Sequence, residues 1–491
     1  MNYKNILNII GKVLQIEAIL LLLPLLVGVI YKESWNTTLF AFFITALCSF
    51  IVGVLLNIPK PKSKKILPRA SFIIVALSWI IVALVGALPL VISKEIPNFF
   101  DAFFEMSSGF TTTGASISTD VEALSHSILF WRSFSHWIGG MGVIVFILAV
   151  LPDDKEGSNM HILRAESPGP SVGKLVSKVS ATARILYLIY IGLTIIEFLF
   201  LFLGPDKKMD LFNSICITLG TAGTGGFSVL NSGCAAYSIY SQYVIAIFMI
   251  LFGINFTLFY LLLIGKFKSV WKNEELRTYI TLVLGSTFFI AITLFVKKIP
   301  EYSNFEECFR HSLFQVASIV STTGYATTDY SLYWPPVCLM VIILLMLTGP
   351  CAGSTGGGIK ISRINLVFKS IVQKVRAMIN PRKVELIKDS GQIVDNEVVK
   401  GADIFIILYV ALLFFVTFII SFDGFDLVTN FTATLSCISN IGPGLNVVGP
   451  MGNFAGFSNF SKFVLSLTMI TGRLELFPMI ALFVPRTWKT K

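Results

Sequence analysis

Apolar residues lie along the chain in long runs that are separated by short polar connections. A run of about 20 apolar residues is long enough to cross the hydrocarbon core of a bilayer as a helix. Each run near this length predicts a membrane-spanning segment. The predicted spans cover residues 12–31, 37–57, 71–93, 126–151, 183–203, 239–265, 278–296, 333–348, 402–421 and 460–484.

Four other apolar segments are too short to span a membrane, and each leads into a loop of glycine and small polar residues. The short segments cover residues 98–108, 209–219, 304–318 and 425–438. The loops align on Gly114, Gly225, Gly324 and Gly442, which are 111, 99 and 118 residues apart. A half-length helix, a glycine loop and a full span therefore form one unit that occurs four times.

This repetition predicts an all-α polytopic membrane protein with four parallel span–pore-loop–span repeats around a central pore, plus two extra N-terminal transmembrane helices. Residues 1–66 form the N-terminal hairpin and 67–152 the first repeat. Residues 153–270 hold a cytoplasmic linker and the second repeat, 271–380 the third repeat with a broken gating helix, and 381–491 a cytoplasmic linker and the fourth repeat. Non-helical backbone at membrane depth must be buried or line a wet cavity, so the loops are expected to line the pore.

Composition excludes a soluble protein, because 55% of the 491 residues are hydrophobic and only 13% are charged. The seven cysteines show neither a disulfide framework nor metal-ligand spacing. No small-residue cleavage site follows the first apolar run, so a cleaved signal peptide is not expected.

The net charge of +10 is read mainly as a sign of topology, with a cytoplasmic partner surface as the alternative. Basic residues gather in alternate connections, which the positive-inside rule places in the cytoplasm together with the N-terminus. No nucleic-acid partner is expected. The clusters are Lys60, Lys62, Lys64, Lys65 and Arg69; Lys174, Lys178 and Arg184; Lys266, Lys268, Lys272 and Arg277; Lys369, Lys374, Arg376, Arg382, Lys383 and Lys388; and Arg486, Lys489 and Lys491.

The glycine loops suit a cation. A narrow ring of backbone carbonyls can replace the hydration shell of K⁺, and glycine permits the backbone angles that turn carbonyls inward. An anion pore would be expected to carry Lys or Arg, and the four aligned windows contain neither.

Glycine and proline interrupt the eighth span, where residues 348–360 include five Gly and one Pro and cannot remain regular helix. We interpret this break as a gate below the ring; a static kink or an ordinary loop are the alternatives. Arg473, inside the last span, is expected to face the permeation path and contact this segment, or else to pair locally with Glu475. The candidate gate residues are Gly349, Pro350, Gly353, Gly356, Gly357, Gly358 and Arg473.

Polar residues of the fourth span are expected to be structural. Arg132 is predicted to snorkel or to form an ion pair, and His136 to be a hydrogen-bonded packing residue rather than a proton relay. Gly139, Gly140 and Gly142 are expected to allow close helix packing.

Together these features resemble the TrkH/KtrB/HKT superfamily of K⁺ translocating proteins, most closely its bacterial TrkH branch, which shares the extra N-terminal pair of spans. The motifs that carry the resemblance are LPRASFIIVALSWIIVALVGALP (67–89), DAFFEMSSGFTTTGAS (101–116), WRSFSHWIGGMGV (131–143), RAESPGP (164–170), GTAGTGGFS (220–228), STTGY (321–325), GPCAGSTGGGIK (349–360) and the helix around Arg473. Arg69-Ala70-Ser71 departs from the commoner Arg-Glu pair.

The resemblance implies K⁺ uptake across the bacterial inner membrane by a homodimer embedded in lipid. It further implies a gating loop at 349–358 and a cytoplasmic, nucleotide-binding, TrkA-like regulatory subunit, with no covalently bound cofactor in this chain. A serine at the first filter glycine accompanies Na⁺ permeation in this superfamily, so Gly114 favours K⁺. The implied K⁺-binding residues are Thr112, Thr113, Gly114, Gly223, Thr224, Gly225, Thr322, Thr323, Gly324, Asn440, Ile441 and Gly442.

Two other functions stay open. The main alternative to a channel-like protein is a K⁺/H⁺ or K⁺/Na⁺ symporter that works by alternating access, for which Glu197 and Glu475 are the candidate acids inside spans. A membrane-embedded enzyme would need a polar catalytic cluster, and the sequence shows no convincing one.

Overall fold

A computed structural model of the chain describes residues 3–59, 68–142, 179–382 and 385–488. Several predictions fall outside these ranges. They are the basic residues Lys60, Lys62, Lys64, Lys65, Lys174, Lys178, Lys383, Lys489 and Lys491, the RAESPGP motif at 164–170, the end of the fourth predicted span at 143–151, and the domain boundaries near residues 66 and 152.

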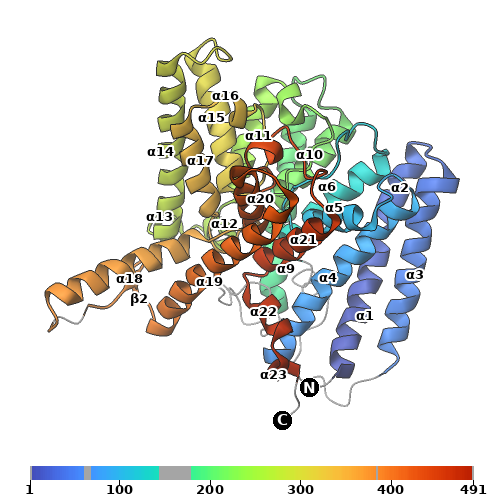
Figure 1. The fold of residues 1–491 in the computed structure, drawn as a ribbon, viewed down its shortest axis with the longest axis horizontal. Helices are drawn as coiled ribbons and strands as arrows, with labels where there is room; N and C mark the ends of the chain where they lie inside the picture. The colour runs from blue at the N-terminus through green and yellow to red at the C-terminus, as the bar shows by residue number, and fades with distance from the viewer. Residues whose placement is uncertain (1–2, 60–67, 143–178, 383–384, 489–491) are drawn as a thin grey trace.

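The described part of the chain is mostly helical (Figure 1). The N-terminal hairpin consists of α1 (Tyr3–Leu20), α2 (Leu22–Ile30), a π-helical turn (Trp35–Leu39) and α3 (Phe40–Asn57). The helices that follow are α4 (Pro68–Ile92), α5 (Phe99–Phe110), α6 (His126–Gly140), α9 (Val179–Phe202), α10 (Leu211–Gly223), α11 (Ile239–Phe252), α12 (Phe256–Leu263), α13 (Phe267–Trp271), α14 (Glu274–Lys297), α15 (Phe305–Val320), α16 (Tyr330–Tyr333), α17 (Pro336–Leu347), α18 (Ile361–Ile379), α19 (Asn396–Ile420), α20 (Leu427–Ser439), α21 (Asn459–Arg473), α22 (Phe477–Phe483) and α23 (Pro485–Trp488).

Short 3₁₀ turns occur at Gly233–Ala236, Ser421–Asp423 and Asn446–Val448. A small antiparallel hairpin joins β1 (Lys388–Asp389) to β2 (Gln392–Ile393), between α18 and α19. In Figure 1, α18 and the start of α19 extend away from the rest of the molecule.

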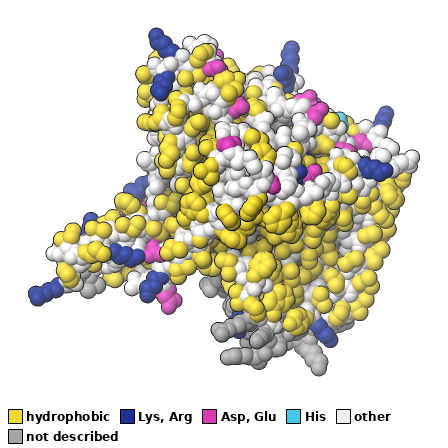
Figure 2. All heavy atoms as spheres, viewed as in Figure 1, with side chains coloured by type: hydrophobic (Ala, Val, Ile, Leu, Met, Phe, Trp, Pro, Cys, Tyr) yellow, Lys and Arg dark blue, Asp and Glu magenta, His cyan; other side chains and the backbone are white. Residues whose placement is uncertain are grey.

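Six of the described helices are long and apolar enough to cross a membrane, and a seventh span results if the bent pair α11–α12 counts as one. Figure 2 shows hydrophobic side chains over the middle of the visible face, while charged side chains lie mostly at its ends and along the α18 arm. This distribution is that of a polytopic membrane protein, as the apolar runs predicted.

Three of the predicted spans are interrupted within the described residues. In the run 126–151, α6 ends at Gly140, and Gly142 has a positive φ of 86°. The other two are the runs 239–265 and 460–484. The run 239–265 bends by 93° between α11 and α12, where the Asn255 side chain accepts a hydrogen bond from the Thr257 amide (2.8 Å) and caps the second helix. The run 460–484 breaks between α21 and α22, where Glu475 and Leu476 have positive φ angles of 53° and 69°. A continuous helix had been expected at all three places.

The four half-length helices, α5, α10, α15 and α20, begin with a polar N-cap. Asn98, Asp210, Asn304 and Asp426 each accept a hydrogen bond from an amide of the first turn, at 2.8–3.1 Å. Hydrogen bonds from the Thr429 hydroxyl and amide hold the pKa of Asp426 below its ordinary value. Each cap fixes the N-terminus of its helix. The C-terminus, which carries the negative end of the helix dipole, therefore lies next to the glycine loop that follows.

The N-terminal hairpin packs against both α4 and α6. Glu33 of the hairpin accepts a hydrogen bond from the Ser127 amide of α6 (3.0 Å), and the Thr38 hydroxyl of the hairpin donates to Glu95, which follows α4 (3.2 Å). Within the hairpin, α1 and α3 approach closely, because a Cβ atom on Gly53 would lie 2.7 Å from the Gly11 carbonyl oxygen.

The close approach predicts that Gly53→Leu separates α1 from α3 and lowers the unfolding temperature of the detergent-solubilised protein, since overpacking costs about 1–3 kcal/mol. Gly192→Leu in α9 is the matched control, because an added Cβ there meets no atom within 4 Å. Equal unfolding temperatures for the two variants would contradict the packing described.

Candidate functional site

Four loops follow the half-length helices and adopt one backbone conformation. The first covers residues 111–117, the second 224–228, the third 321–326 and the fourth 440–444. Each contains a non-glycine residue in the left-handed region and, two residues later, a glycine with positive φ. The pairs are Thr112 (57°) and Gly114 (79°), Thr224 (54°) and Gly226 (79°), Thr322 (59°) and Gly324 (90°), and Asn440 (56°) and Gly442 (104°).

The four loops close into a ring, because each glycine packs against a backbone carbonyl of the next loop. An added Cβ would lie 2.0 Å from the neighbouring oxygen for Gly114 (on Gly225) and Gly226 (on Thr323), 2.1 Å for Gly324 (on Ile441) and 2.7 Å for Gly442 (on Thr113). No side chain fits at these distances. The contact from the fourth loop back to the first completes the circle, which we call the glycine ring.

In the second loop, the glycine equivalent to Gly114 lies one residue later than the sequence analysis predicts. Its counterpart of Gly114 is Gly226, and Gly223, which had been aligned with Thr112, is instead the last residue of α10. Gly225 fills a different role: an added Cβ on it would lie 2.0 Å from the imidazole of His136. The second loop therefore has two adjacent glycines with different contacts. Gly226 packs against the third loop, and Gly225 packs against His136 of α6.

Side-chain hydroxyls and one amide brace the glycine ring from within. Thr111 and Thr113 share a hydrogen bond of 2.7 Å between their hydroxyls, and Ser321 and Thr323 repeat this contact at 2.7 Å. The Asn440 side-chain amide donates to the Thr113 hydroxyl (3.0 Å), so the fourth loop is tied to the first.

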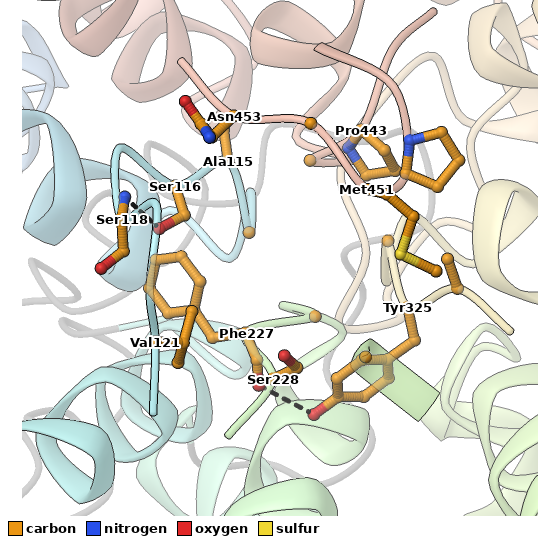
Figure 3. A pocket seen from close by; sticks show the side chains of 18 of the residues that line it. Ala115, Ser116, Ser118, Val121, Phe227, Ser228, Tyr325, Pro443, Met451 and Asn453 are labelled. Atoms are coloured by element: carbon orange, nitrogen blue, oxygen red, sulfur yellow. Dashed lines mark hydrogen bonds between the residues drawn. The ribbon is translucent and has the colours of Figure 1, made fainter. Parts of the chain in front are cut away.

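A cavity of about 150 Å³ opens on one side of the ring, and all four ring glycines line it. Figure 3 looks into this cavity, which we call the outer cavity after the topology predicted from the basic residues. Ser116 of the first loop, Phe227 and Ser228 of the second, Tyr325 of the third and Pro443 beside the fourth glycine surround it.

The glycine-rich segment 348–360 packs against the third and fourth loops. An added Cβ on Gly356 or Gly357 would lie 2.6 Å from the carbonyl oxygens of Ser321 and Ser439, respectively. The Gly357 amide donates to the Thr322 hydroxyl (2.8 Å). The segment therefore touches the ring directly.

Hydrogen bonds order this segment. Glu275 at the start of α14 accepts from the amides of Ala352 (2.7 Å) and Ser362 (3.1 Å). The buried Lys360 ammonium donates to the carbonyls of Gly356 and Gly357. The broken span is thus a defined structure rather than an open loop. Neither Glu275 nor Lys360 had been predicted as part of the site, because nothing in the sequence pairs Glu275 with a segment nearly 80 residues away.

Arg473 ends α21 and reaches the segment, as predicted. Its guanidinium donates to the carbonyls of Thr355 (2.7 Å), Gly139 (2.5 Å) and Gly140 (2.6 Å). Arg473 lines a second, inner cavity of about 80 Å³ together with Gly353, Gly356, Gly357, Gly358 and Lys360. Glu475 forms an ion pair with Arg363 of α18.

The contacts predicted for the polar residues of α6 are present. Arg132 forms a buried ion pair with Glu105 (2.8 Å). His136 accepts from the Phe227 amide through Nε2 (3.3 Å), so its Nδ1 donates to the Gly109 carbonyl (2.7 Å). An added Cβ on Gly139 would lie 1.8 Å from the Phe110 carbonyl oxygen, which shows the close packing expected of this glycine.

A ring of four glycine loops between two polar cavities, inside a bundle of membrane-spanning helices, is typical of membrane proteins that transport cations. The model of the TrkH family, described as "Cation transport protein", matches residues 38–490, and the chain belongs to this family.

Relatives extend over the whole chain. It is 34% identical over 496 residues to the Trk system potassium uptake protein TrkH of Escherichia coli K12, with both chains fully covered. It is 33% identical over 488 residues to TrkG of the same organism, covering 98% of this chain and 97% of that protein. The crystal structure of the potassium transporter TrkH from Vibrio parahaemolyticus superimposes with a TM-score of 0.87 at 29% identity, with both chains fully covered.

The two hydrogen bonds of Glu275 predict that Glu275→Ala loosens the glycine-rich segment, because the amides of Ala352 and Ser362 lose their acceptor. Buried Cys351 should then react faster with a membrane-permeant thiol reagent, as followed by mass spectrometry of its peptide. Glu397→Ala, at an exposed carboxylate of α19, should leave the labelling rate unchanged. Equal rates in all three proteins would contradict the anchoring role of Glu275.

Proposed function

We propose that this chain takes up K⁺ across the bacterial inner membrane, in a channel-like manner, through the glycine ring. The observation that carries the proposal is the closure of four loops by contacts between each glycine and a carbonyl of the next loop. The potassium uptake named for the E. coli relatives supports the choice of ion.

Carbonyl oxygens of the ring replace the water that surrounds K⁺ in solution, and the strained left-handed residues keep these oxygens in place before the ion arrives. In the second loop, Gly226 replaces Gly223 among the proposed ligands, because Gly223 is the last residue of α10 and Gly226 has the positive φ of the other ring glycines. The proposed ring residues are Thr112, Thr113, Gly114, Thr224, Gly225, Gly226, Thr322, Thr323, Gly324, Asn440, Ile441 and Gly442.

The glycine-rich segment is the proposed gate on the inner side of the ring. Gly349, Pro350, Gly353 and the run 356–358 would move away to open the path, and Arg473 would stabilise the closed arrangement through its bond to Thr355. The N-terminus faces the cytoplasm in this proposal. There, the α18 arm would connect the gate to a nucleotide-binding, TrkA-like subunit, within a homodimer.

One observation favours symport as the second candidate function. Glu197 is fully buried in α9, next to Thr221 of α10, and an intramembrane carboxyl in such a place is typical of proton sites. Uptake into proteoliposomes under a K⁺ gradient alone separates the two mechanisms. Flux without a proton or sodium gradient supports the channel, whereas flux that needs a proton gradient and is lost in Glu197→Gln supports symport.

The contacts of the ring predict that Gly114→Ser and Gly226→Ser both lower the K⁺/Na⁺ flux ratio, by about tenfold, because the new Cβ displaces a carbonyl of the next loop. Gly285→Ser in α14, where an added Cβ meets nothing within 4 Å, is the control. Unchanged ratios for Gly114→Ser would exclude the ring as the filter. An effect at Gly114 without one at Gly226 would refute the equivalence of the two glycines.

Removal of residues 353–358 should raise the basal K⁺ flux of the purified, folded protein, since Gly356 and Gly357 lie directly against the third and fourth loops. Flux is measured in proteoliposomes with no partner subunit. Gly401→Ala, at a site open around the added Cβ, serves as the control. Equal or lower flux in the shortened protein would rule out the gate.

A further inference from the structure

A buried ion pair lies behind the first two loops of the glycine ring. Glu105 of α5 and Arg132 of α6 are joined by a bond of 2.8 Å between Oε1 and Nε, and their side chains are 0% and 1% exposed. Burial of two charges costs free energy unless their remaining hydrogen-bonding groups are also satisfied. The partners of those groups therefore show what the pair holds in place.

The remaining bonds of Glu105 go to the first loop. Its carboxylate accepts from the Ser116 hydroxyl (2.9 Å) and from the Ile117 amide (2.9 Å). Ser116 and Ile117 lie two and three residues after Gly114, where the chain leaves the ring. Glu105 thus ties the helix that precedes the first loop to the segment that leaves it.

The remaining bonds of Arg132 connect the first loop to the second. Its guanidinium donates to the Ser116 hydroxyl (3.2 Å) and to the Ser228 carbonyl (3.4 Å), and it lies 4.2 Å from the centroid of the Phe227 ring. One turn along α6, His136 accepts from the Phe227 amide (3.3 Å). Two side chains of α6 therefore set the distance between the exit segments of neighbouring loops.

At the exit segments of the other loops, hydrogen bonds between neighbouring quarters come from neutral groups. The Tyr325 hydroxyl donates to the Phe227 carbonyl (3.3 Å) between the second and third loops, and the Tyr330 hydroxyl to the Gly444 carbonyl (3.3 Å) toward the fourth. The Phe454 amide donates to the Ser116 carbonyl (2.9 Å) where the fourth quarter meets the first. The contact between the first and second loops uses a charged group, Arg132. This charge needs its own explanation, because Arg132 also lines the outer cavity through which a cation would enter.

We propose that Glu105 and Arg132 are positioning residues that act as one neutral brace, with two effects on the transported ion. The fork of Arg132 holds the first two loops at the spacing that favours K⁺ over Na⁺. The carboxylate of Glu105 cancels the charge of Arg132, which would otherwise repel cations from the outer cavity. This inference rests on the proposed K⁺ transport through the ring.

Arg132→Lys tests the spacing. Lysine keeps the charge and can still pair with Glu105, but a single ammonium cannot reproduce the planar fork that reaches Ser116 and Ser228 together. We expect K⁺ flux to remain within about threefold of wild type and the K⁺/Na⁺ ratio to fall by about tenfold. Arg310→Lys is the matched control: Arg310 is also a mostly buried arginine paired with a glutamate, Glu306, but its other partner is Gln242 of α11.

Glu105→Gln and the double variant Glu105→Gln/Arg132→Met test the charge. The single variant leaves a positive charge beside the cation path, so K⁺ flux should fall by about tenfold or more. The double variant removes that charge and should recover most of the flux while the K⁺/Na⁺ ratio stays low. If the pair were purely structural, the K⁺ flux of the double variant would be as low as that of Glu105→Gln.

All variants are compared in proteoliposomes with matched amounts of folded, monodisperse protein. A wild-type ratio in Arg132→Lys overturns the brace, and equal flux in Glu105→Gln and the double variant overturns the charge cancellation. If Glu105→Gln does not fold, Arg132→Lys alone tests the spacing of the loops, and Arg132→Met tests the effect of the positive charge. A K⁺ flux well below wild type in Arg132→Met overturns the proposed repulsion by Arg132. Absence of K⁺ flux in the wild type would refute the proposed function itself and is distinguishable from each of these results.

Discussion

The glycine ring depends on one steric constraint: neighbouring loops approach so closely that a carbonyl oxygen of one occupies the place where the other would carry a Cβ atom. The constraint applies at Gly114, Gly226, Gly324 and Gly442. Backbone that is not helical at membrane depth must be buried in protein or line a wet cavity, so the surrounding protein must hold it in place. The capped half-length helices, the left-handed residues before each glycine and the hydroxyl pairs all serve to hold it.

The same constraint joins the ring to the glycine-rich segment. An added Cβ on Gly356 or Gly357 would lie 2.6 Å from the carbonyl oxygen of Ser321 or Ser439, and the Thr322 hydroxyl accepts a hydrogen bond from the Gly357 amide. The surface that would select the ion and the surface that would close the path are therefore in direct contact. Movement of the segment must change the surroundings of Thr322, so the two proposed roles of this region are physically coupled.

Much of this architecture could be predicted from the sequence, because the length of each apolar run and the glycine loop that follows it are local features. The fourth loop was recognisable although Asn440 replaces threonine, since asparagine also tolerates the left-handed conformation. The bend near Asn255 was missed, because one glycine and one asparagine hardly interrupt the hydropathy of their run. The contacts of Glu105 and Glu275 depend on tertiary structure, and no local pattern could have revealed them.

The contact between the fourth and first loops has a consequence for biogenesis. The hydrogen bond from Asn440 to Thr113 joins residues 327 positions apart, so the ring cannot close until the C-terminal quarter has entered the membrane. Until then the loops lack the neighbours against which their glycines pack. A truncated chain would consequently carry polar loop backbone without its packing partners instead of forming a smaller pore.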